Sequence, residues 1–140
     1  MKALVINGPN LNMLGKRPKE HYGTLTLYEI NDMMVKEAEG IELEFFQSNS
    51  EGEIVTEIQY ALGNFDAIII NPAAYTHTSV AIHDALEIFD GIIIEVHLSH
   101  VDDREDFRKI NFIRECATVT FSGKKEGSYI DAVRYLKNIK

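Results

Sequence analysis

Five short runs of apolar, mostly β-branched residues recur along the chain, and this recurrence limits the possible fold more than any other feature. The runs cover residues 3–6, 43–46, 67–70, 92–96 and 118–121. Two of them contain three consecutive isoleucines instead of alternating apolar and polar residues, which is typical of strands buried on both faces of a parallel sheet. We therefore expect five parallel strands with helices on both sides.

Amphipathic helical segments separate these runs. Thr26 and Glu29 have the spacing of a capping box, as do Ser50 and Glu53, so helices are expected to begin at both places. Apolar residues then recur at helical spacing in three stripes: Ile54, Ile58, Ala61 and Leu62; Ile82, Ala85, Leu86 and Phe89; Tyr129, Ala132, Val133 and Leu136. A short further helix is expected at residues 104–109. The alternation predicts right-handed crossovers and a single flavodoxin-like, doubly wound α/β domain.

One connection is longer than a strand-to-helix turn requires. Residues 9–23 include two prolines and two glycines, whereas such connections usually have about 2–6 residues. A connection of this length is either a lid over a ligand site or a disordered segment. We predict a lid.

Charge and composition exclude several classes of function. The 140 residues carry a net charge of −8, whereas nucleic acids and anionic membranes bind clustered Lys and Arg. Cys116 is the only cysteine, so neither an internal disulfide nor a thiolate metal cage is possible. The N-terminus has no signal-peptide core, and no apolar run approaches the ~20 residues of a transmembrane helix. These features predict a soluble, cytoplasmic protein with a buried structural thiol.

Polar side chains follow each of the first four expected strands. They occupy residues 7–10, 47–49, 71–77 and 95–99 and are mostly amides, hydroxyls and imidazoles. Because ligands of open parallel sheets bind outside the carboxyl ends of the strands, these residues are expected to form the ligand site.

Other sites known for this fold class fit the sequence poorly. A phosphoacceptor receiver needs acidic residues where this chain has Asn7 and Asn71, and a serine hydrolase needs the pattern G-x-S-x-G. A phosphate cradle needs a Gly/Ser/Thr-rich loop, and Schiff-base chemistry favours a lysine within an apolar strand. A metal site stays open as an alternative, with the candidate ligands Glu95, His97, His100, Asp102 and Asp103.

Four longer segments resemble one known family. They are NGPNLNMLGKRPKEHYG (7–23), FFQSNSEGEIVTEIQ (45–59), INPAAYTHTSVAIHDAL (70–86) and EVHLSHVDDREDFR (95–108). In order, spacing and residue type they are similar to the type II 3-dehydroquinate dehydratases. The resemblance implies a lyase that dehydrates 3-dehydroquinate to 3-dehydroshikimate through an enolate, in the shikimate pathway, without cofactor, metal or Schiff base. The alternatives are the same reaction in quinate breakdown and a non-catalytic module that binds a small acid.

The resemblance also implies roles for residues of this sequence. Tyr22 matches the general base, and Arg17 matches the lid arginine that lowers the pKa of that phenol. His97 corresponds to the general acid, Glu95 to the carboxylate beside it, and Asn10 to the residue that holds a water on the enolate oxygen. The remaining matches are substrate-binding groups: Asn71, His77, the Leu98 and Ser99 amides, Arg108, and Asp84, which the family supplies from a neighbouring subunit of a dodecamer built from four trimers.

Elementary electrostatics is compatible with a tyrosine base. Lowering a tyrosine pKa from about 10 to neutrality requires about 4 kcal/mol. One pair of opposite charges about 4 Å apart, at an effective dielectric of about 20, supplies about that much. Arg17 precedes Tyr22 on the same loop, and Arg108 is a second candidate. Judged on residue type alone, Tyr22 equally fits a loop aromatic that packs on the core, and His97 fits a hydrogen-bonded structural histidine.

Three positions depart from the family pattern. Ala73 stands where glycine is common, His83 where arginine is usual, and His100 where asparagine is usual. None of them matches a proton-transfer residue, so the expected chemistry is unchanged. His83 flanks Asp84, which leaves the details of the subunit contact open.

Overall fold

The computed structural model describes residues 1–139, with Asp102 described by its backbone alone. Its centre is an all-parallel sheet with the strand order β2-β1-β3-β4-β5. The strands are β1 (Lys2–Asn7), β2 (Glu42–Gln47), β3 (Ala67–Asn71), β4 (Ile92–His97) and β5 (Val119–Ser122). Each begins and ends within one residue of its predicted bounds, and the predicted α/β fold class is confirmed.

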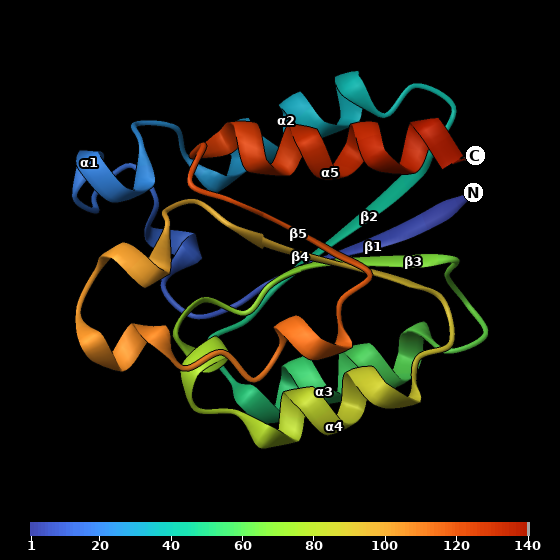
Figure 1. The fold of residues 1–140 in the computed structure, drawn as a ribbon. Coiled ribbons are helices and arrows are strands. Elements are labelled where there is room, and N and C mark those ends of the chain that lie inside the picture. The colour runs from blue at the N-terminus through green and yellow to red at the C-terminus, as the bar shows by residue number, and fades with distance from the viewer. Residues whose placement is uncertain (140) are drawn as a thin grey trace.

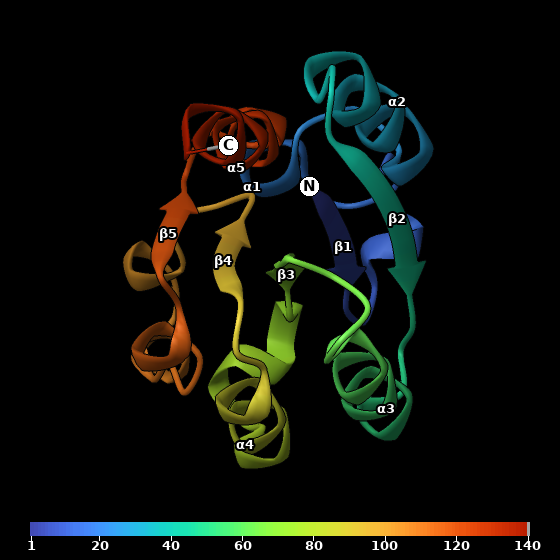
Figure 2. The ribbon, with the colours of Figure 1, turned by 90° about the vertical axis from the view of Figure 1, so that its right-hand side faces the viewer.

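Helices cover both faces of the sheet, as Figure 2 shows. On one face lie α2 (Leu27–Glu37) and α5 (Glu126–Ile139), and on the other lie α3 (Glu51–Ala61) and α4 (Val80–Ile88). Thr26 and Glu29 form the complete capping box predicted for α2. Ser50 caps α3 by accepting from the Glu53 amide, but the Glu53 carboxylate turns to the Ser48 hydroxyl, so the second box is only half formed.

The two helical layers explain why the strands are apolar at every position. Ile69 packs with α2 and α5, whereas its neighbours Ile68 and Ile70 belong to the separate core under α3 and α4. All three are completely buried. Burial of an isoleucine side chain stabilises a fold by roughly 1.5–3 kcal/mol. A polar residue that points to either face of the sheet would therefore be costly. None of the helices in residues 1–139 has the length and apolar character needed to cross a bilayer.

The long connection 9–23 folds over the carboxyl ends of the strands, at the left of Figure 1. It contains a short 3-10 helix, η1 (Leu11–Met13), and one turn of α-helix, α1 (Lys19–Tyr22). Leu11, Leu14 and Tyr22 are buried against the α2 and α5 core. The segment therefore has an apolar anchor of its own, and its role as a lid stays a prediction.

The helix predicted at residues 104–109 is not an α-helix. The chain instead makes separate 3-10 turns, η3 (Val101–Asp103) and η4 (Asp106–Lys109), followed by η5 (Arg114–Cys116). Among the described side chains of residues 99–109, only Val101 is buried, and Phe107 is 61% exposed. Without an apolar face to pack, a short helix gains too little to offset its nucleation cost.

The ends of β1 and β3 approach so closely that position 8 has no room for a side chain. The Gly8 amide donates to the Asn71 carbonyl at 2.9 Å, and a Cβ on Gly8 would lie 2.5 Å from the Pro72 oxygen. We expect Gly8→Ala to lower the free energy of unfolding by about 1–3 kcal/mol in urea denaturation, because the backbone must move. Gly52→Ala is the control: it lies in α3 with its nearest atom 3.9 Å away and should stabilise slightly. Equal losses in both variants would contradict the steric argument.

Candidate active site

A cavity of about 550 Å³, including the space at its open mouth, lies at the carboxyl ends of β1, β3 and β4. This volume suits a small organic ligand. The cavity brings together nine of the predicted site residues: Asn10, Arg17, Tyr22, Asn71, His77, His97, Leu98, Ser99 and Arg108. They come from four separate segments of the chain, which meet because the carboxyl ends of parallel strands share one edge of the sheet.

Two guanidinium groups hold the Tyr22 phenol. Arg17 stacks on the ring, with its central carbon 3.6 Å from the ring centroid. Arg104 reaches across from the segment after β4 and donates from Nη1 to the phenol oxygen at 2.7 Å. Arg108, which we considered as the second arginine, instead pairs with Glu105 while lining the same cavity. Arg104 is thus a cation in hydrogen-bond contact with the phenol, and sequence reasoning missed it.

The three arginines make the cavity locally cationic in an acidic protein. Burial lowers the pKa of Arg17, and the nearby charges of Arg104 and Arg108 add to this effect, while Tyr22 opposes it. Arginine stays protonated despite such shifts because its ordinary pKa lies above 12. The cavity is therefore suited to an anionic ligand.

His97 and Glu95 form a buried pair at the end of β4. His97 Nε2 lies 2.6 Å from Glu95 Oε2, and the two residues are 3% and 0% exposed. Burial raises the pKa of Glu95, but hydrogen bonds to the carboxylate, first from His97 and then from Asn111 and Thr120, outweigh it and hold that pKa below the usual range. The carboxylate fixes a proton on Nε2 and leaves Nδ1 as the nitrogen free to exchange a proton.

His77 is suited to accept rather than donate a hydrogen bond in the cavity. Its Nδ1 lies 2.6 Å from the Ile110 carbonyl, so this nitrogen carries the proton. Burial lowers the pKa of His77, and the positive charges of Arg108, His97 and Arg104 lower it further, although the bond to Ile110 opposes this. In the neutral ring, Nε2 therefore presents a lone pair that can accept from a ligand hydroxyl.

Asn71 is held by bonds on both sides of its amide. Its Oδ1 accepts from the Ala73 amide at 3.0 Å, and its Nδ2 donates to the Tyr129 hydroxyl at 2.9 Å. Tyr129 is completely buried, donates in turn to Asn7 Oδ1 at 2.6 Å, and has its pKa raised by burial. One amide hydrogen of Asn71 is left for a ligand. Sequence reasoning placed Tyr129 only in an apolar stripe, because a buried hydroxyl has no periodicity signal.

Two backbone positions at the rim are left-handed. Asn10, with φ of 70°, receives support from Asn49, whose Oδ1 accepts from the Asn10 amide at 3.0 Å. Ala73 has φ of 55°, a region that favours glycine. The departure from glycine at position 73 therefore imposes backbone strain beside Asn71 and leaves the cavity lining in place.

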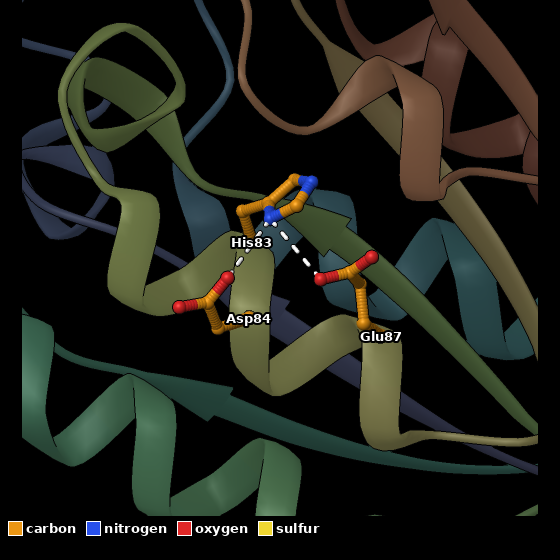
Figure 3. A group of neighbouring side chains, drawn as sticks. All are labelled: His83, Asp84 and Glu87. Carbon is orange, nitrogen blue, oxygen red and sulfur yellow. Dashed lines mark hydrogen bonds and ion pairs between the residues drawn. The ribbon is translucent and has the colours of Figure 1, made fainter.

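Asp84 lies outside this cavity, on the exposed surface of α4. Its Oδ1 is 3.2 Å from His83 Nδ1, and Glu87 Oε1 is 3.5 Å from the same nitrogen (Figure 3). Glu115 Oε1 lies 2.9 Å from His83 Nε2. The bond to Asp84, followed by the charges of Glu87 and Glu115, raises the pKa of His83 although desolvation opposes this. The raised pKa favours the protonated form of His83, which places a positive charge beside Asp84, as an arginine at this position would.

The metal alternative around Glu95 and His97 is not assembled. The His100 ring packs against Gly123 instead, and the Asp102 side chain lies outside the described residues. Across the described part of the chain, the one group that brings three potential ligand atoms within 4.8 Å of one another is His83, Asp84 and Glu87. Both nitrogens of His83 already contact carboxylates, so ion pairing accounts for this group. The half-buried Cys116 thiol nearby contacts the His83 carbonyl, and burial followed by the charge of Glu87 raises its pKa to about 11.

Comparison with known proteins gives a consistent result. The family model described as dehydroquinase class II matches residues 1–137. The 3-dehydroquinate dehydratase of Geotalea daltonii is 50% identical over 140 residues, covering 99% of this chain and 97% of that protein. The type II dehydroquinase structure from Butyrivibrio crossotus is 44% identical, with a TM-score of 0.94, covering 98% of this chain and 97% of that one. The corresponding structure from Propionibacterium acnes is 34% identical, also with a TM-score of 0.94, covering 98% and 96%. The chain belongs to the class II dehydroquinase family.

Proposed function

We propose that this chain dehydrates 3-dehydroquinate to 3-dehydroshikimate through an enolate. The observation that carries the proposal is the cavity itself: a phenol held by two guanidinium groups and an imidazole held by a buried carboxylate line the same space. A base on one side and an acid on the other are what an elimination of water requires. The names of the relatives, 3-dehydroquinate dehydratase and type II dehydroquinase, support the same reaction.

The first half of the reaction is removal of a proton from the carbon next to the ketone. Tyr22 acts as the base in its phenolate form, which the hydrogen bond from Arg104 and the charge of Arg17 stabilise. The electron pair of the broken C–H bond moves onto the ketone oxygen and forms the enolate. Asn10, at the rim of the cavity, holds a water against this oxygen.

The second half is departure of the hydroxyl group. His97 gives a proton to the leaving oxygen from Nδ1, since Nε2 is engaged by Glu95. The C–O bond breaks, the enolate electrons form the new carbon–carbon double bond, and water leaves. The product is an enone conjugated with the ring carboxylate.

The other groups bind the substrate. Its carboxylate fits the Leu98 and Ser99 amides and Arg108, and its hydroxyls fit the free amide hydrogen of Asn71 and the lone pair of His77. Because these groups lie in a locally cationic cavity, a protein with a net negative charge can bind an anionic substrate there.

Asp84 completes the site from a second subunit in this proposal. Its side chain is 68% exposed and does not line the cavity of its own chain, so in this proposal it acts on the site of a neighbouring subunit. A dodecamer of four trimers, acting in the cytoplasm in aromatic biosynthesis, is the setting that the family resemblance favours. Size-exclusion chromatography with light scattering measures the assembly directly.

The direct test is to mix the purified protein with 3-dehydroquinate and follow ultraviolet absorbance of the enone, with and without a metal chelator. We expect the enone to appear at the same rate in both. Binding of 3-dehydroquinate without enone would indicate a small-acid-binding module instead. Chelator-sensitive turnover would contradict the metal-free mechanism.

A further inference from the structure

Glu95 sits in a set of hydrogen-bond donors that extends beyond its partner His97. Its Oε2 accepts from Asn111 Nδ2 at 2.7 Å as well as from His97, and its Oε1 accepts from Thr120 Oγ1 at 2.8 Å. Asn111 lies in the segment before η5, and Thr120 lies on β5 beside Glu95 in the sheet register. The two residues are not among those that line the cavity, so they act on it through Glu95.

These donors matter because the charge of His97 changes during the proposed reaction. Before proton transfer, imidazolium and carboxylate form a buried ion pair. Once His97 has given its proton away, Glu95 is a buried carboxylate next to a neutral ring, and burial alone favours protonation of such a carboxylate. The pair must then take one proton from solvent for the next turnover. If Glu95 took that proton, His97 would stay neutral and would be a far weaker proton donor than the imidazolium.

We propose that Asn111 and Thr120 are positioning residues that keep Glu95 anionic throughout the cycle, so that the returning proton resides on His97. Two neutral donors replace part of the stabilisation that the imidazolium gives, and they do so at the moment when the imidazolium is absent. The inference rests on the proposed dehydration, because it is there that His97 cycles between charged and neutral forms.

Apart from His97, the charged and titratable groups near Glu95 contribute little to keeping it anionic, so the neutral donors Asn111 and Thr120 have this role. Besides His97 on the same strand, Glu95 has Arg114 of η5 near it, with Nε 3.9 Å from Oε1. The Arg114 side chain is 48% exposed, so solvent screens its charge. Among the described residues, Cys116 of η5 also interacts electrostatically with Glu95, and with a pKa of about 11 it is uncharged at neutral pH.

The first test removes one donor without changing shape. In Thr120→Val, loss of the hydroxyl raises the pKa of Glu95, so the acid limb of the kcat–pH profile should move up by about 1 pH unit and kcat on that limb should fall about 10-fold. KM should change little, because Thr120 does not line the cavity. Thr120→Ser keeps the hydroxyl and should restore the profile. Thr118→Val is the matched control, because it loses only a 3.2 Å bond from the Ile93 amide.

The second test replaces the Asn111 amide, which donates to Glu95, with a carboxylate, which donates only when it is protonated. Asn111 Oδ1 accepts from the Ile113 and Arg114 amides at 2.8 and 2.9 Å, and Asn111→Asp keeps an oxygen for both. At neutral pH the new carboxylate faces Glu95, and kcat should fall about 100-fold. As the pH is lowered, the protonated Asp can donate to Glu95 again, so part of the activity should return and the optimum should move toward acid.

The outcomes separate this inference from the function on which it rests. A wild-type protein that forms no enone contradicts the dehydration itself. An active wild type, with Thr120→Val and Asn111→Asp lowered by the same factor at every pH, shows that both residues have only a structural role and overturns the inference. Shifted profiles in opposite directions, with rescue by Thr120→Ser, support it.

Discussion

Tyr22→Phe should reduce kcat by about 10³-fold or more while leaving the protein folded and able to bind substrate. The phenol oxygen is the one group that the substitution removes, and general base catalysis is typically worth about 10²–10⁴-fold. The ring keeps its buried position against the core and its stacking with Arg17. Steady-state kinetics on 3-dehydroquinate, together with direct binding of the substrate by calorimetry, separates the loss of turnover from any loss of affinity.

Tyr75→Phe is a matched control for this variant. The Tyr75 hydroxyl also makes a 2.7 Å hydrogen bond, which it donates to the Asn49 carbonyl, and Tyr75 does not line the cavity. The control should retain nearly all activity and should lose a similar, small amount of stability. Substantial turnover by Tyr22→Phe would show that another group removes the proton.

The fold could be predicted from the sequence because its strongest signals are local. Consecutive isoleucines at 68–70 and 92–94 require apolar cover on both faces, and the parallel sheet with two helical layers supplies it. The Thr26 capping box likewise depends on residues three apart. The segment 101–109 was harder, because its acidic residues suit a helix start while too few apolar residues exist to pack one.

The site was predictable where it follows from strand order and missed where it depends on side-chain reach. Residues at strand ends, such as Asn71 and His97, meet at one edge by topology. The contact between Arg104 and Tyr22 joins two loops 82 residues apart, and no periodicity records it. No sequence pattern identifies the residues that donate to Glu95 either. Asn111 and Thr120 are ordinary polar residues in the sequence, and only the fold places them 2.7 and 2.8 Å from one buried carboxylate.

We expect Arg104→Met and Arg108→Met to have different kinetic effects, one on kcat and the other on KM. Both line the cavity, but Arg104 donates to the phenol oxygen whereas Arg108 pairs with Glu105. In the proposed reaction, Arg104 stabilises a charge that develops during catalysis, and Arg108 binds a carboxylate that is charged throughout. Interactions made only in the transition state change kcat, while uniform binding changes KM.

Arg104→Met should therefore lower kcat by about 10²–10³-fold with a modest change in KM, and Arg108→Met should raise KM with a smaller effect on kcat. Methionine keeps much of the apolar stem of arginine, so packing against Tyr22 is retained and the loss reports the charge. Arg104→Lys should fall between wild type and Arg104→Met, because an ammonium group keeps the charge but not the planar fork that reaches the phenol at 2.7 Å. If Arg104→Met changed only KM while Arg108→Met lost kcat, the arginine that stabilises the phenolate would be Arg108, the second candidate named from the sequence.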